Sequence, residues 1–144
     1  MEMTDNLISL LQEEKQLWQD FYELTLSQQN CLTPEKTEDL LKLVDEKEDC
    51  IKSLKKLQEK ISSIEDDHKE VVQENPKVII ELKAEISQLI QKAKALDTTN
   101  RSILINHFSE YKKELGQYQA AKGAVLKYSK DLSAGKGYFI DTNR

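Results

Sequence analysis

The chain has 144 residues, 33% of them charged, and it contains only four glycines and two prolines. This composition suits helices with charged outer faces and argues against a β or α/β domain, which needs more turn residues. No stretch approaches the roughly 18 apolar residues of a membrane span, and the first residues lack the basic start and apolar run of a secretory signal. We therefore expect a cytoplasmic, all-α protein.

The net charge of -5 is unevenly distributed along the chain. From Arg101 onward, eight basic and four acidic residues give +4, so the first 100 residues carry -9. The lysines of this last third are scattered rather than clustered, which is typical of a solvated helix face. We predict no binding to nucleic acid.

The first predicted helix spans about residues 5–30. Its apolar residues recur at steps of three and four, which places them on one face of a helix, and Thr4 or Asp5 can cap its start. The inner face is predicted to hold Leu7, Leu11, Leu17, Trp18, Phe21, Leu24 and Thr25.

Two prolines divide the rest of the chain. Pro34 follows Thr33 and Pro76 follows Asn75. Proline suits the first position of a helix, threonine or asparagine before it can cap that helix, and the residue before proline resists the helical conformation. Each pair therefore predicts the end of one helix and the start of the next.

The second predicted helix spans about residues 34–70, and Lys47 is a polar intruder in its apolar stripe. The other members of the stripe are Leu40, Val44, Ile51, Leu54, Leu57, Ile61 and Ile64.

The third predicted helix spans about residues 76–130. Residues 97–100 resemble a loop in composition, but the stripe keeps its phase across them, so we predict one continuous helix with Asn100 facing inward. The alternative is that Asn100 caps a separate helix. The predicted stripe comprises Ile79, Leu82, Ile86, Leu89, Ala93, Leu96, Asn100, Ile103, Phe108, Tyr111, Leu115, Tyr118, Ala121 and Val125.

These spans predict an elongated antiparallel three-helix bundle or coiled coil over residues 1–130, with a very long third helix and a flexible C-terminal tail over residues 131–144. At 1.5 Å per residue, with the second helix counted to Val72, its farthest predicted end, the helices measure roughly 39, 58 and 82 Å. The third helix would then overshoot the first turn from about Leu115 to Lys130. An exposed apolar ridge of this kind usually marks a binding surface.

The predicted partner-binding residues lie in this overshoot and in the tail. They are Leu115, Tyr118, Val125, Leu126, Tyr128, Tyr138, Phe139 and Ile140. Two alternatives stay open: a fourth short helix could fold back after Gly116 or Gly123 to complete the core, and the three tail residues could pack against the bundle rather than on a partner.

No motif for catalysis, for a cofactor or for a metal is found. His68 and His107 are isolated, and Cys31 and Cys50 are expected to be free thiols because a reducing cytoplasm disfavours a disulfide. We therefore predict that the protein is not an enzyme and binds no small-molecule substrate.

Several features together resemble the FlgN family of flagellar type III export chaperones. They are the three-helix pattern, Leu96 with Asn100, Tyr128, and the terminal residues Gly137, Tyr138, Phe139, Ile140 and Asp141. The resemblance implies a cytoplasmic chaperone that holds the terminal helices of hook-filament junction proteins until export. It also implies that the C-terminal region binds these clients and that a tyrosine there docks transiently at the export gate. Tyr128 matches that tyrosine, although Ser129 follows it where the family often has glycine, and Tyr118 is the substitute candidate.

A second hypothesis explains the same stripe differently. The chain could be a structural or tethering coiled coil that self-associates, whereas an export chaperone is expected to be a monomer or a weak homodimer. Sedimentation separates the two hypotheses, because only the self-associating coiled coil requires an oligomer that depends on concentration.

Overall fold

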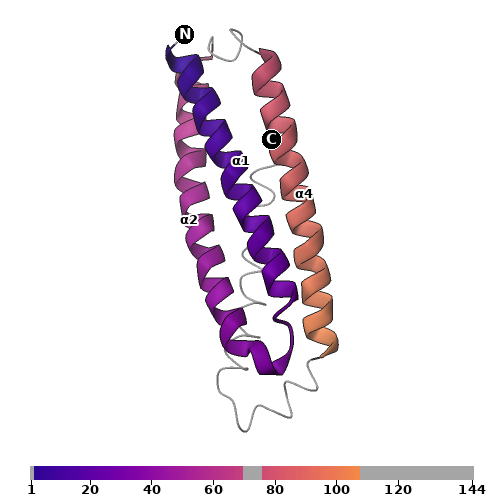
Figure 1. The fold of residues 1–144 in the computed structure, drawn as a ribbon. Helices are drawn as coiled ribbons and strands as arrows, with labels where there is room; N and C mark the ends of the chain where they lie inside the picture. Colours follow the sequence, from indigo (N-terminus) through magenta and orange to yellow (C-terminus); the bar gives the residue numbers. More distant parts are fainter. Residues whose placement is uncertain (1, 70–75, 108–144) are drawn as a thin grey trace.

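The computed structural model describes residues 2–69 and 76–107, and helices are the regular secondary structure of this part of the chain (Figure 1). Its elements are α1 (Glu2–Gln29), the short 3-10 helix η1 (Pro34–Lys36), α2 (Thr37–Asp67) and α4 (Pro76–Asn106). α1 and α4 run in the same direction, and α2, which lies between them in the sequence, runs in the opposite direction (Figure 1). The predicted all-α class is confirmed for these residues.

α1 is the central helix of the bundle. It packs closely against both α2 and α4, whereas the backbones of α2 and α4 approach each other at far fewer points. The sequence predicted that the third helix would run back beside the second. In the structure the closest neighbour of α4 is instead the parallel helix α1, and side-chain bridges such as Lys83 Nζ to Glu65 Oε1 at 2.8 Å join α4 to α2.

The predicted break at Pro34 is confirmed, but the predicted cap is not. Thr33 is extended, with φ -120° and ψ 151°, yet its side chain makes no capping hydrogen bond. The chain instead forms η1, in which the backbone N–H of Lys36 donates to the carbonyl of Thr33 at 3.0 Å. α2 therefore begins at Thr37, three residues after the proline. Pro76 begins α4 as predicted, and Asn75 lies outside the described residues.

α4 continues through residues 97–100 without a break, so the alternative of a separate helix starting at Asn100 is wrong. The hydroxyls of Thr98 and Thr99 donate to the carbonyls of Lys94 and Ala95 at 3.0 and 3.1 Å. Each bond runs four residues back along the same helix, which accommodates threonine within helical backbone. The predicted continuation to residue 130 and the tail over residues 131–144 lie outside the described residues.

The predicted inner faces are mostly confirmed. Members of all three stripes are buried, including the two polar positions Lys47 and Asn100. Leu17, Leu24, Ile51 and Ile64 are only partly buried at the edges of the core. The buried residues that the stripes predicted are Leu7, Leu11, Trp18, Phe21, Thr25, Leu40, Val44, Leu54, Leu57, Ile61, Ile79, Leu82, Ile86 and Ala93.

From Leu89 onward, several inner positions of α4 lie one residue later than predicted. Leu89, Leu96 and Ile103 are only half-buried, and the residues that follow each of them, Ile90, Asp97 and Leu104, occupy the inner positions. The cause is the side-by-side packing of α1 and α4, which the Lys15 Nζ to Glu85 Oε2 pair spans at 2.6 Å. Leu89 and Leu96 share a helix face with Glu85, so they lie at the edge of this seam rather than between α1 and α2.

Candidate functional site

The eight predicted partner-binding residues, from Leu115 to Ile140, lie outside the described residues. The structure does show where the chain leaves the bundle to reach them. Leu104 is buried with Leu32, from the turn between α1 and α2, and with Leu40 and Val44, from the start of α2. The backbone N–H of His107 donates to the carbonyl of Ile103 at 3.1 Å. We call this group the turn-end cluster: Leu32, Leu40, Val44 and Leu104.

The turn-end cluster corrects the predicted position of the overshoot. The prediction had α2 measuring about 58 Å and gave α4 cover as far as Leu115, but 31 residues at 1.5 Å per residue span only about 46 Å. α4 therefore already reaches the α1–α2 turn at Leu104. The described helices thus end their cover of α4 at Leu104 rather than at Leu115, and the predicted binding residues lie outside the described residues.

Next to the turn-end cluster lies a buried layer of polar side chains from all three helices. We call Thr25, Gln28, Lys47, Asp97 and Asn100 the polar layer; each is at most 8% exposed. Lys47 Nζ lies 2.8 Å from Asp97 Oδ1 and 2.9 Å from Gln28 Oε1. The same ammonium lies 4.5 Å from the centroid of the Phe21 ring, which adds a cation–π contact. One buried lysine thus joins α1, α2 and α4.

Asn100 makes the second link within the polar layer. Its Nδ2 donates to the backbone carbonyl of Thr25 at 3.0 Å, and the Thr25 hydroxyl donates to the carbonyl of Phe21 at 2.8 Å. The Oδ1 atom of Asn100 is buried and accepts no hydrogen bond within the described part of the chain. This oxygen loses its hydration on folding and gains no hydrogen bond in return among the described residues, which costs free energy. The hydrogen bond from Nδ2 favours one register of α1 against α4, so Asn100 specifies the register at a cost in stability.

A second buried polar group lies in the middle of the bundle. Glu14 is 7% exposed and accepts hydrogen bonds from Trp18 Nε1 and Gln58 Nε2, both at 3.3 Å. Burial raises the pKa of Glu14 above its ordinary value, and the bonds from Gln58 and Trp18 offset part of that increase. Nearby, burial raises the pKa of the Cys50 thiol to about 11, and both cysteines are free as predicted.

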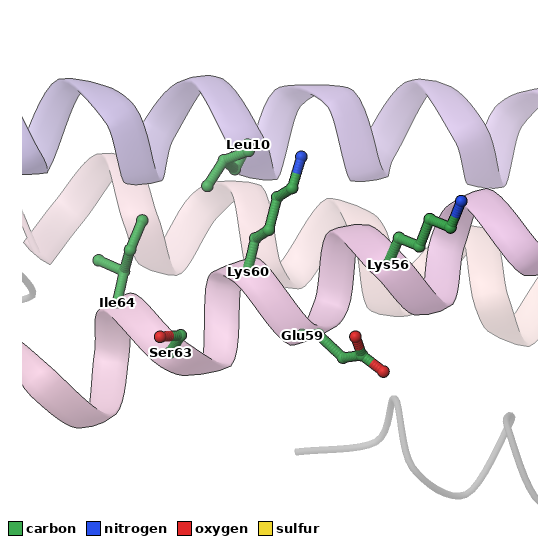
Figure 2. Close-up of a pocket in the computed structure, with 6 residues that line it drawn as sticks. All are labelled: Leu10, Lys56, Glu59, Lys60, Ser63 and Ile64. Carbon is green, nitrogen blue, oxygen red and sulfur yellow. The ribbon is translucent and has the colours of Figure 1, made fainter.

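A shallow groove lies between α1 and α2. Figure 2 shows Leu10 of α1 facing α2, with Lys60 reaching toward α1 and Glu59 directed away from it. The groove is open to solvent, and its polar groups do not converge on one point, so it lacks the features of a small-molecule site. Its lining residues are Leu10, Lys56, Glu59, Lys60, Ser63 and Ile64.

Over residues 2–69 and 76–107, no group of three or more His, Cys, Asp or Glu side chains could hold a metal ion. None of the described helices combines the length and the apolar character that crossing a membrane needs.

Comparison with known protein families shows a match to the family described as FlgN protein, over residues 1–131. The chain belongs to the FlgN family. The predicted resemblance is therefore confirmed. Membership implies a general role as a flagellar export chaperone, and the family is a chaperone family that is not known as enzymatic. Comparison with curated proteins and with solved structures gives no match.

The FlgN match divides the predicted binding residues. It includes Leu115, Tyr118, Val125, Leu126 and Tyr128, but it ends before Tyr138. The terminal residues from Gly137 to Asp141, which formed part of the resemblance, therefore lie outside the matched region.

Sequence reasoning about this FlgN chain missed Gln28 and Asp97. The signal that could have found them was Lys47, because a lysine within an apolar stripe needs an acidic or amide partner at the same level of the bundle. In the sequence, Asp97 belongs to a stretch whose composition resembles a loop, which hides its inward position. Glu14 was also missed, since it directly follows the exposed Glu13 and nothing in the sequence distinguishes the two glutamates.

Replacing Glu14 with glutamine is expected to stabilise the FlgN fold, relative to the native chain, increasingly as the pH rises. Burial raises the folded-state pKa of Glu14 above 4.5, so its contribution to stability is present below the unfolded-state value and is lost as the pH rises through the folded-state pKa. Glutamine does not titrate. Urea denaturation of both proteins from about pH 4 to about pH 7 measures the difference. The matched control is Glu13→Gln, at the exposed neighbouring position, which measures the effect of the same substitution outside the core. A flat difference for Glu14→Gln would contradict the assignment.

Proposed function

We propose that this chain is a cytoplasmic export chaperone for flagellar hook-filament junction subunits. Its last third would bind the amphipathic terminal helices of these subunits, prevent premature assembly, and deliver them to the type III export gate. The observation that carries the proposal is the FlgN match over residues 1–131. The particular client, the gate and the compartment are parts of the proposal.

The position of the binding segment supports this proposal. The inner face of α4 is covered by α1 and α2 as far as Leu104, where the bundle meets the α1–α2 turn. The sequence continues the same apolar spacing beyond this point through Leu115, Tyr118 and Val125. In the sequence, these residues come after Leu104, the last side chain of α4 that the described helices bury. A client helix with apolar residues at steps of three and four could supply that cover.

The same arrangement suggests how capture and release would work. An amphipathic client helix would bury against the chaperone the face that it later uses to pack against other subunits. Because part of the binding energy would be spent on ordering the segment, affinity would stay moderate and release would be easy. Tyr128 would contact the export gate, with Tyr118 as the alternative.

Deleting residues 123–144 is expected to reduce the affinity for a client terminal-helix peptide at least a hundredfold. The helix content should fall only slightly, because α1, α2 and α4 all end before residue 123. Titration calorimetry measures the affinity, and far-UV circular dichroism measures the helix content. Unchanged affinity in a folded deletion variant would rule out the proposed binding site.

A pair of point variants serves as the matched control for the deletion. Val125→Asp places a charge on the apolar stripe, whereas Lys127→Asp places one two residues away on the polar face. We expect only Val125→Asp to weaken client binding strongly. Equal losses in the two variants would indicate a general charge effect rather than an apolar contact.

The described residues weaken the alternative of self-association through the stripe. From Ile79 to Leu104 its inner positions are already buried against α1 and α2 of the same chain. A dimer that used this part of the stripe would have to open the bundle. Sedimentation of the free chain is therefore expected to show a monomer at micromolar concentration.

A further inference from the structure

The polar layer divides the buried apolar residues into two separate clusters. Along α2 it lies between Val44 and Cys50, and along α4 between Ala93 and Leu104. Along α1 it follows Phe21 at the end of the helix, and Leu32 comes after it in the turn. The chain thus changes from apolar to polar and back to apolar at the same level of the bundle in all three places. This coincidence makes the layer a boundary rather than an isolated defect.

The two clusters differ greatly in size. Among the described residues, thirteen buried side chains form the main core, and only four form the turn-end cluster. Local stability follows the amount of apolar surface that a region buries. The main core comprises Leu7, Leu11, Trp18, Phe21, Cys50, Leu54, Leu57, Ile61, Ile79, Leu82, Ile86, Ile90 and Ala93.

We infer that the turn end of the bundle, residues 28–46 and 98–107, opens and closes as one local unit while the main core stays folded. Opening exposes the four side chains of the turn-end cluster and hydrates the polar layer. The unpartnered Oδ1 of Asn100 gains hydrogen bonds to solvent when this happens, which lowers the free energy of opening. The polar layer is therefore the hinge between two parts of unequal stability.

The unit includes the last part of α4. This helix enters the unit at Thr98 and ends within it at Asn106. Opening of the turn end therefore displaces the last turns of α4 while the main core stays folded. This inference stands on the described residues and does not depend on the identity of the client.

Native-state hydrogen exchange on the full chain tests the inference. Amides of residues 40–46 and 100–106 are expected to exchange at least tenfold faster, after correction for intrinsic rates, than amides of residues 54–61 and 86–93. The two turn-end segments should share one opening equilibrium, because they belong to one unit. A single protection level throughout the bundle would overturn the inference. So would a gradient confined to the end of α4, which would indicate simple fraying.

The variant Asn100→Leu provides the second arm of this experiment. Leucine is close to asparagine in shape, removes the unpartnered oxygen, and joins the two apolar clusters. Exchange at the turn end should slow at least tenfold, while exchange in the main core should change less than threefold. The matched control Thr99→Leu, at the exposed neighbouring position, corrects for helix propensity. An equal effect of the two variants would also overturn the inference.

Discussion

Replacing Lys47 with methionine is expected to lower the free energy of unfolding by about 3 to 5 kcal/mol. The substitution leaves the Asp97 carboxylate buried, 3% exposed, without the ammonium that lies 2.8 Å from it in the native chain. It also removes the hydrogen bond to Gln28 and the cation–π contact with Phe21. Since the free energy of unfolding of an ordinary domain is about 5 to 15 kcal/mol, this loss is a large fraction of the total stability. Urea denaturation followed by circular dichroism measures it.

Two further variants show whether the buried charge is responsible for this loss. Lys47→Met combined with Asp97→Leu should recover most of the lost stability, because an apolar pair of similar volume can replace a buried ion pair. Lys52→Met, at an exposed lysine of the same helix, should change stability by less than about 0.5 kcal/mol. If the double variant were no more stable than Lys47→Met alone, the loss would have to come from packing rather than from Asp97.

The second large effect is expected from Trp18→Ala, at about 3 to 5 kcal/mol of lost stability. The indole is fully buried in the main core. Its ring packs edge-on against Phe21, with centroids 5.4 Å apart and an interplanar angle of 71°. Its Nε1 also donates to Glu14 at 3.3 Å, so the variant leaves a cavity and removes one hydrogen-bond donor from a buried carboxyl.

The control for Trp18→Ala is Ile80→Ala. Ile80 is a large apolar residue that is 64% exposed on α4, so its truncation should change stability by less than about 0.5 kcal/mol. Both measurements use the same denaturation assay. A loss below about 1.5 kcal/mol for Trp18→Ala, within the range of mild substitutions, would mean that the main core does not depend on this indole.

The sequence alone determined the helical class, the breaks at Pro34 and Pro76, and most of the buried positions. These features are local. A proline restricts the backbone at its own position and at the preceding one, and an apolar period of three and four residues specifies one helix face. The inward position of Asn100 and the continuity of α4 also followed from this period. The resemblance to the FlgN family, confirmed over residues 1–131, rested on the same pattern together with residues near the C-terminus.

Only the tertiary structure decided which helices pack together and which polar residues meet. α4 lies beside α1, and Asp97 rather than Leu96 occupies an inner position of α4. Both features depend on contacts between segments that are far apart in the sequence. Lys47 and Asp97 are 50 residues apart, and no local rule links them. A helical period gives the direction of a side chain relative to its own axis, but the partner it meets depends on the position and rotation of the other helices.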